Sequence, residues 1–188
     1  QKTAYEIYQC DWSSDVCSSD LWAGARGRGW RPHPHRLGTM ADALVFSIVG
    51  AESTGKTVLA QALAARVAEE TGLAAAWVPE ALRLWCERQG RTPRPHEQAA
   101  IAAEQRAAVA AAARTHDVVI ADTSPLMVAL YSRMLFQDDS LVAEAIAWQR
   151  GCTLTLLTAL DLPWVADGHQ RDGPHVRAPV DEIGRAHV

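Results

Sequence analysis

The sequence predicts an α/β fold in which helices cover both faces of a parallel sheet. Strand-like apolar runs alternate with helix-like segments from residue 43 to residue 160. This alternation is typical of parallel sheets, whose neighbouring strands are joined by crossover helices. A second observation is the glycine-containing loop Gly50–Thr57, which separates the first strand-like run from the first helical segment. Together these observations predict a three-layer architecture with a ligand site at the ends of the strands.

The loop Gly50–Thr57 has the complete sequence of a Walker A phosphate-binding motif, Gly-Ala-Glu-Ser-Thr-Gly-Lys-Thr. Its setting between a strand and a helix lets backbone N–H groups and a helix N-terminus converge on phosphate oxygens. Lys56 is also the only lysine besides Lys2 in a chain that otherwise uses arginine. The sequence therefore predicts a P-loop that binds a nucleoside triphosphate. The residues expected to bind its phosphates are Gly50, Ala51, Glu52, Ser53, Thr54, Gly55, Lys56 and Thr57.

Two helices and a strand are predicted directly after the loop. Thr57–Thr71 carries apolar residues at helical spacing and stops before a glycine. Leu73–Val78 is a short apolar strand that ends at a proline, and Ala81–Gln89 is a helix that stops before a second glycine. The segment Arg91–His96 is expected to be a proline-stiffened loop.

The second half of the domain repeats the alternation. The expected elements are, in order, an alanine-rich helix to about Arg114, a buried strand at Asp117–Ala121, a helix from Pro125 to about Phe136, a helix capped by Ser140 that runs to Arg150, and a strand at Thr153–Leu160. From Asp161 onward the sequence predicts a loop.

Two motif residues and one acid have expected roles in phosphoryl transfer. Lys56 is expected to reach the β- and γ-phosphates, and Thr57 to place its hydroxyl on Mg²⁺. Asp122 follows the third strand at the position of a Walker B carboxylate, where it could hold Mg²⁺ directly or through water. The alternative role for Asp122 is the N-cap of the next helix, although Thr123 or Ser124 could fill that position equally well.

Glu80 is the candidate general base. It comes just after the second strand, where open α/β sheets place their ligands. A carboxylate there could take the proton from an acceptor hydroxyl. The alternative is a helix N-terminal acid that the helix dipole favours.

The glycine- and proline-rich segment from Trp164 to Arg177 is the candidate lid. Arginines on a mobile lid suit the binding of a transferring phosphate and the exclusion of water. Arg171 is therefore a candidate catalytic residue and Arg177 a candidate ATP ligand, with a solvated loop as the alternative. Trp85 and Trp164 could stack on a flat aromatic base, which makes them candidate substrate-binding residues, unless they belong to the core.

Composition narrows the class of protein. The net charge of −4 gives no reason to expect a nucleic-acid partner. No run approaches 18 apolar residues, so we expect no membrane segment and a cytoplasmic location. Cys86 and Cys152 are too few and too far apart for a zinc site and are expected to be buried reduced thiols. No oligomeric state is predicted.

Both ends of the chain are predicted to be non-native. Codons that can encode Asp15–Leu21 have a reverse complement that can encode Glu182–Val188, a relation typical of sequencing-library adapter. We therefore expect residues 1–21 and 182–188 to be translated adapter and exclude them from fold reasoning.

The Gly-, Arg- and Pro-rich stretch 22–39 shows no apolar period. We expect it to be disordered upstream sequence ahead of a start at Met40, with a basic nucleic-acid-binding arm as the alternative. The predicted domain is therefore residues 40–181.

Several segments, taken together and in this order, resemble the NadR-type nicotinamide riboside kinase family and its AAA-type P-loop domain. They are Gly50–Thr57, Trp77–Trp85, Gly90–Pro93, Ala121–Leu126, Pro163–Gly168 and Gln170–Pro174. The resemblance covers about residues 43–181. It implies a three-layer P-loop NTPase fold of the nucleoside- or nucleotide-kinase type that binds ATP with Mg²⁺. It also implies phosphorylation of the 5′-hydroxyl of nicotinamide riboside to the mononucleotide, a step of NAD biosynthesis.

Residue by residue, the resemblance implies that Gly50–Thr57 binds ATP, that Asp122 serves the metal or acceptor region, and that Arg171 belongs to the lid. Glu80 as the base follows from its position together with similarity to small nucleoside kinases. We further expect a domain truncated at its C-terminus, because the tail 182–188 stands where the family's last helix and strand would follow.

Two other functions are compatible with the motif. One is a regulatory or switch-type P-loop ATPase without a small acceptor, and the other is an inactive ATP-binding fragment. Glu80, the aromatic residues and the arginine lid favour the kinase.

Overall fold

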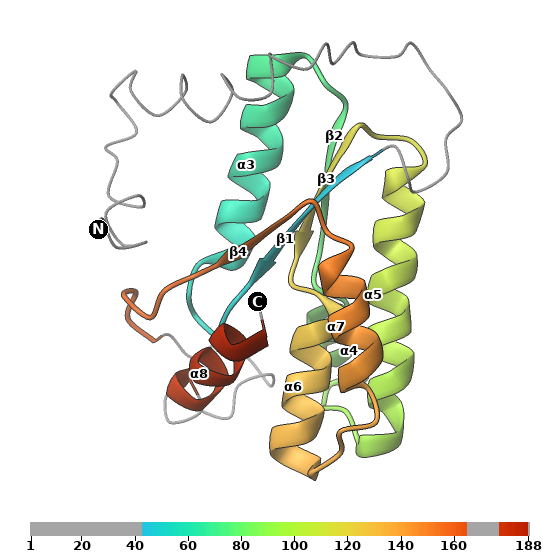
Figure 1. Ribbon diagram of the computed structural model, residues 1–188, viewed down its shortest axis with the longest axis vertical. Helices are drawn as coiled ribbons and strands as arrows, with labels where there is room; N and C mark the ends of the chain where they lie inside the picture. Colours follow the sequence, from blue (N-terminus) through green and yellow to red (C-terminus); the bar gives the residue numbers. More distant parts are fainter. Residues whose placement is uncertain (1–42, 165–176, 188) are drawn as a thin grey trace. The chain divides into compact units, whose positions relative to one another are not determined.

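Four parallel strands form the sheet of this protein, in the order β2-β3-β1-β4 (Figure 1). The computed structural model describes residues 43–164 and 177–187, and side chains up to Glu182. All of them fall within one unit, Leu37–Val188. The elements are β1 (Leu44–Val49), α3 (Lys56–Thr71), β2 (Ala75–Val78), α4 (Ala81–Gln89), η1 (Pro95–Glu97), α5 (Gln98–Ala113), β3 (Val118–Asp122), α6 (Pro125–Phe136), α7 (Val142–Arg150), β4 (Leu154–Leu157) and α8 (Arg177–His187).

The strand register brings the functional segments to one edge of the sheet. Ile48 of β1 pairs with Asp122 of β3 on one side and with Leu156 of β4 on the other. Because all these strands run in the same direction, the segments that follow β1, β3 and β4 leave the sheet side by side. This edge is where open α/β sheets bind ligands.

Alternating side chains of the strands pack on helices of opposite faces. On one face Leu44, Phe46 and Ile48 pack with α3, as do Val118 and Ile120 of β3. On the other face Val45 and Val119 pack with Val109 and Ala113 of α5 and with Trp148 of α7. Figure 1 shows the resulting layers, with α3 on one side of the sheet and α5, α6 and α7 on the other. The predicted three-layer α/β fold is confirmed.

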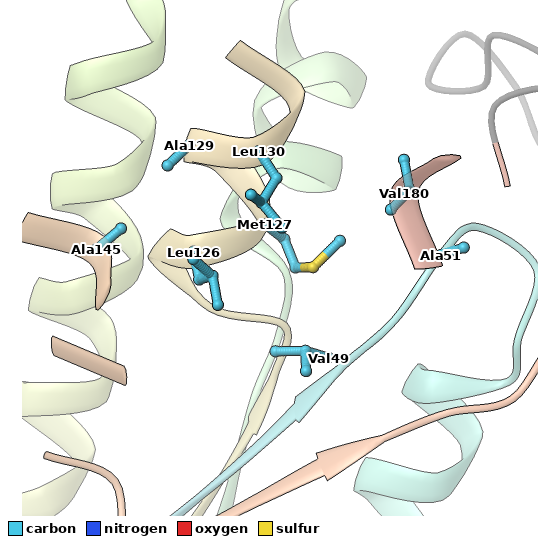
Figure 2. Packing of buried hydrophobic residues seen from close by; sticks show 8 residues of the cluster. All are labelled: Val49, Ala51, Leu126, Met127, Ala129, Leu130, Ala145 and Val180. Carbon is cyan, nitrogen blue, oxygen red and sulfur yellow. The ribbon is translucent and has the colours of Figure 1, made fainter. Parts of the chain in front are cut away.

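A cluster of eight buried residues supports the start of the loop after β1 (Figure 2). Val49 and Ala51, at the end of β1 and just beyond it, contact side chains from three helices. The other members are Leu126, Met127, Ala129 and Leu130 of α6, Ala145 of α7 and Val180 of α8. Since seven of these residues are aliphatic and all are buried, the hydrophobic effect stabilises the packing of the start of the loop against these helices.

Two predictions about helices are wrong. From Asp161 onward we predict a loop, but α8 occupies Arg177–His187, where Val180 is only 1% exposed against the Ala51 cluster. The burial of Val180 in this cluster adds a tertiary contact that stabilises the helix. The N-cap of α7 is Leu141 and not Ser140, because the carboxylate of Asp138 accepts a hydrogen bond from the Ser140 N–H at 2.9 Å and holds it in a turn.

The other elements agree with the sequence to within a few residues. β2 is shorter than predicted at its start and β4 at both of its ends. The segment 182–187 lies in α8, and its origin as adapter stays a prediction. Among the described residues, none of the helices combines the length and apolar character needed to span a bilayer.

Candidate phosphate-binding loop and adjoining cavity

The loop between β1 and α3 requires glycine at both of its ends. Gly50 has a φ of 147° and Gly55 a φ of 77°, values that L side chains rarely adopt. A Cβ atom at Gly50 would lie only 2.1 Å from Thr158 Oγ1, so no larger residue fits at that position. Ser53 also has a positive φ, 54°. Positive-φ residues within a short turn are typical of nests, in which backbone N–H groups bind anions.

Thr158, just beyond β4, holds the loop through its hydroxyl. Its Oγ1 lies 2.6 Å from Thr54 Oγ1, and the Thr54 hydroxyl is also 2.8 Å from the carbonyl oxygen of Ala51. The Thr158 N–H donates to the carbonyl oxygen of Val49 at 2.9 Å, which extends the pairing of β1 and β4. Both threonines are 6% exposed. Hydrogen bonds within the protein therefore stabilise the conformation of the loop.

Lys56 directs its charge into the same loop. Its Nζ donates a hydrogen bond to the carbonyl oxygen of Ala51 at 2.6 Å. Ala51 is fully buried, so this carbonyl oxygen is a fixed acceptor and the ammonium group is held at the concave side of the motif, where it lines a cavity. A positive charge placed this way attracts phosphate oxygens.

Asp122 and Thr57 form the candidate metal site. Asp122 is 1% exposed, and burial raises the pKa of its carboxyl, although a hydrogen bond with the Thr57 side chain and the charges of Lys56 and Arg83 act in the opposite direction. Its Oδ1 has no hydrogen-bond partner among the described residues. The alternative role as an N-cap falls to Ser124, whose Oγ accepts from the Leu126 N–H at 3.2 Å.

These two side chains fit a magnesium ion by their chemistry. Mg²⁺ binds hard oxygen ligands and is usually held by one or two carboxylates together with substrate phosphates. Thr57 and Asp122 supply a hydroxyl and a buried carboxylate with an unused lone pair. The described part of the chain contains no cluster of three or more His, Cys, Asp or Glu side chains that would bind a metal without a nucleotide.

A cavity of about 300 Å³ opens directly from the loop. It begins at the motif and continues between α4, the segment before η1, the start of α5, and α6. The residues that line it are Gly50, Glu52, Ser53, Lys56, Glu80, Leu82, Arg83, Cys86, Thr92, Pro93, Gln98, Thr123, Met127, Tyr131, Leu135 and Phe136. The lining combines charged side chains of the loop and of α4 with apolar and aromatic side chains of α6. Such a mixture is typical of a site for a small molecule.

Comparison with known proteins assigns the chain to a family. A scan of protein families matches residues 45–188 to the AAA domain family. The chain belongs to this AAA domain family. A search of the curated proteins finds no match.

Two solved structures share the fold of this AAA domain. One is the NadR protein in complex with NAD and AMP-PNP, with a TM-score of 0.61 and 20% identity over 78% of this chain and 41% of that chain. The other is the NadR protein in complex with NR, with a TM-score of 0.60 and 20% identity over 78% of this chain and 43% of that chain. The chain thus spans less than half the length of these NadR chains, and it forms a NadR-like P-loop domain.

Glu80 lies at the cavity of this AAA domain, as its candidate role requires. It is the N-cap residue of α4 but makes no side-chain capping hydrogen bond. Gln105 of α5 serves the helix end instead, because its Oε1 accepts a hydrogen bond from the Ala81 N–H at 2.7 Å. The carboxylate of Glu80 lines the cavity, with its Oε2 3.8 Å from the Nε of Arg83.

The two candidate tryptophans are not among the residues that line the cavity. Trp85 packs against Ala81, Ile101, Ala102 and Val128, and the guanidinium group of Arg91 lies 4.8 Å from its ring centre. Trp164 is half-buried, and its Nε1 has no hydrogen-bond partner in the described parts of the chain. Their role in substrate binding stays a prediction.

Of the two candidate lid arginines, only Arg177 is among the described residues. Arg171 lies outside the described residues. Arg177 is the first residue of α8, is 9% exposed, and donates from Nη2 to the carbonyl oxygen of Leu162 at 3.0 Å. Leu162 in turn contacts the loop, since its Cδ1 is 3.1 Å from where a Cβ of Gly55 would lie. Arg177 is therefore linked to the helix end of the phosphate loop through one residue.

Gln98, Thr123, Tyr131 and Phe136 are among the cavity residues that sequence reasoning did not assign to the site. Gln98 shares with Gln105 the buried face of α5, where a polar residue among alanines was an available signal. Thr123 has a φ of 75°, which is rare for a β-branched residue, and its Oγ1 is buried without a partner among the described residues. Strained residues of this kind cluster at functional sites.

Proposed function

We propose that the chain is an ATP-dependent kinase that phosphorylates a small nucleoside, with nicotinamide riboside as the acceptor. The observation that carries the proposal is the continuous cavity that joins Lys56 of the phosphate loop to Glu80 and then to the aromatic part of α6. An ATPase without an acceptor needs no cavity for a nucleoside besides its ATP site. A kinase needs one, because phosphoryl transfer requires an acceptor hydroxyl in line with the γ-phosphate.

Each end of the cavity suits one part of the reaction. Backbone N–H groups of the loop and the ammonium group of Lys56 would bind the phosphates of ATP. Glu80 would accept the proton of the acceptor hydroxyl as the new P–O bond forms, with ADP as the leaving group. Tyr131 and Phe136 would contact the flat ring of the nucleoside at the far end.

Thr57 and Asp122 would hold Mg²⁺ beside the phosphates. The ion, when bound, neutralises charge that develops on the phosphate oxygens during transfer. The burial of Asp122 and its hydrogen bond with the Thr57 side chain support this proposal, because they hold the two oxygen ligands together.

The NadR structures support the choice of substrates. They were solved with NAD and AMP-PNP in one case and with NR, nicotinamide riboside, in the other. At 20% identity this likeness shows a shared fold, so the acceptor of this chain is a proposal that rests on the cavity.

The release of ADP from ATP and Mg²⁺ tests the proposal, measured with and without nicotinamide riboside. We expect release to require the nucleoside. In the Glu80→Gln variant, ATP binding should persist while release falls on the order of 10²-fold or more, the usual contribution of a general base. Turnover that is equal with and without any nucleoside would contradict the kinase and favour a switch-type ATPase.

A further inference from the structure

The side chain of Gln98 places a buried amide in the wall of the cavity. It is the first residue of α5, is 2% exposed, and lines the cavity close to Thr92 and Pro93 in the sequence. Its Oε1 has no hydrogen-bond partner among the described residues. Buried polar groups are nearly always hydrogen-bonded, so an unpartnered one that faces a cavity points to a missing ligand group.

The other buried glutamines of the chain show what a structural amide looks like here. Gln105, on the same face of α5, accepts the Ala81 N–H with its Oε1 at 2.7 Å. Gln149 of α7 donates from Nε2 to Thr155 Oγ1 at 2.7 Å. Neither lines the cavity. Gln105 Nε2 and Gln149 Oε1 also lack a partner among the described residues, but each of these amides is bonded to the protein through its other atom. Gln98 differs from both because its side chain lines the cavity and has no such bond among the described residues.

Among the described residues, the positive charges that line the cavity are balanced by negative ones, so none is set aside to bind the carboxylate of a ligand. Two bases, Lys56 and Arg83, are matched by two acids, Glu52 and Glu80. Lys56 is bonded to the Ala51 carbonyl oxygen at 2.6 Å, and Arg83 lies 3.8 Å from the Glu80 carboxylate. The part of the cavity formed by α6 is apolar and aromatic. A neutral polar group therefore suits the neighbourhood of Gln98 better than an anion.

We propose that Gln98 determines specificity by binding a primary carboxamide of the acceptor, so that the cavity selects the amide over the corresponding carboxylate. Two primary amides can exchange two hydrogen bonds, one N–H to each carbonyl oxygen, whichever way the Gln98 amide is turned. A carboxylate has only acceptor oxygens, so one of them would face the Gln98 carbonyl oxygen without a proton between them. The inference rests on the proposed function, since it assigns the acceptor of that same site.

The test compares kcat/KM for nicotinamide riboside with kcat/KM for nicotinate riboside, the carboxylate analogue. In the unchanged chain we expect a preference for the amide of roughly tenfold to a hundredfold, the range of one or two hydrogen bonds that leave a group unpaired when lost. Gln98→Met has a similar shape but no polar atoms, and it should reduce this ratio to about threefold or less.

Two further variants keep the result interpretable. Gln149→Met removes a buried amide that is remote from the cavity, and its ratio should equal that of the unchanged chain. Gln98→Glu presents acceptors only and repels a carboxylate, so its ratio should rise instead of fall. If Gln98→Met does not fold, the rise with Gln98→Glu alone decides the question.

The outcomes separate the inference from the function on which it rests. Phosphorylation of nicotinamide riboside with a ratio that neither Gln98 variant changes would overturn the inference alone. Absence of phosphorylation, together with absence of nicotinamide riboside binding by calorimetry, would overturn the proposed function and the inference with it. Binding without turnover leaves the affinity ratio of the two ribosides, measured by calorimetry in the same variants, as the deciding quantity.

Discussion

Three charged side chains at the site, Lys56, Asp122 and Glu80, are held by different means, and this decides how each responds to substitution. Lys56 is anchored on a backbone carbonyl, Asp122 is buried beside a hydroxyl, and Glu80 is placed by a helix end that another side chain caps. In the proposed reaction the first would supply charge, the second a metal ligand, and the third a proton acceptor. Their substitutions should therefore affect different measured quantities.

Lys56→Ala should abolish turnover, with a loss on the order of 10³-fold or more, because the charge that stabilises the transferring phosphate is removed. The free energy of unfolding should change little, since the Ala51 carbonyl oxygen keeps the Thr54 hydroxyl at 2.8 Å. Turnover is measured by ADP release and stability by urea unfolding. Lys56→Arg, which keeps the charge but not the compact ammonium, is the control and should recover only part of the rate.

Asp122→Asn should lower activity and raise stability at neutral pH. Burial raises the pKa of the Asp122 carboxyl above its ordinary value of 3.8, so over part of the pH range above 3.8 the folded chain keeps a proton that the unfolded chain has released. Between these two pKa values the stability of the unchanged chain falls as the pH rises, and asparagine removes that loss.

The measurement is urea unfolding of both chains across acidic and neutral pH. The gain from Asp122→Asn should vanish below pH 3.8, where both chains carry a neutral group. Equal stability of the two chains at every pH would show that the burial of this charge has no energetic cost. Activity, measured in parallel with excess Mg²⁺, should fall on the order of 10²-fold.

At the scale of elements, the phosphate loop depends on β4 as well as on the strand and helix that flank it. Thr158 follows β4 and holds the loop through the Thr54 hydroxyl at 2.6 Å. Thr158→Val keeps the shape of the side chain but removes this bond. We expect a loss of about 1 kcal/mol in the free energy of unfolding and a several-fold weaker binding of ATP. Thr158→Ser keeps the hydroxyl and should behave nearly as the unchanged chain in both measurements.

The segment before α5 is a second element-scale support, because it brings Thr92 and Pro93 to the cavity. Arg91 anchors it by an ion pair with Glu97 at 2.7 Å and by its position over the Trp85 ring. The carboxylate of Glu97 accepts hydrogen bonds from the Arg91 side chain and from the Arg94 backbone N–H, and these lower the pKa of the Glu97 carboxyl from 4.5 to about 2. Trp85 thus stabilises this segment through its contact with Arg91, although it does not itself line the cavity.

Glu97→Gln should loosen this segment. The KM for the acceptor should rise up to roughly fivefold, as for a partly exposed ion pair, while kcat changes little. Because the pKa of Glu97 is lowered in the folded chain, its contribution to stability is complete above pH 4.5 and is lost as the pH falls toward 2. Unfolding curves of the two chains should therefore differ at neutral pH and converge in acid. A constant difference across that range would contradict the role given to this pair.

For the whole molecule, the sequence predicts the sheet and most helices because their signals are local. Apolar strands such as Leu44–Val49 and helices that end at Gly72 or Gly90 show their limits in a few neighbouring residues. The helix α8 was missed because the residues from Glu182 onward were assigned to adapter, which left only the first residues of the helix for the prediction. Val180 is also buried in the cluster that contains Ala51, a residue far away in the chain, and a local pattern does not show that contact.

The candidate site also has a part that the sequence predicts and a part that it does not. The phosphate loop, Asp122 and Glu80 follow motifs or strand ends and were predicted. The part of the cavity that would contact the nucleoside is assembled from α5 and α6, so Gln98 and Tyr131 come together only in three dimensions. Their side chains have no fixed spacing that a motif could capture.

The central claim is that the molecule transfers the γ-phosphate of ATP to the nucleoside. The most direct measurement follows the isotopically labelled γ-phosphate, in the presence of Mg²⁺ and nicotinamide riboside, by mass spectrometry of the products. The account predicts label in nicotinamide mononucleotide in an amount equal to the ADP formed, and loss of that label in Glu80→Gln. Label found only in inorganic phosphate, with the nucleoside unchanged, would contradict it.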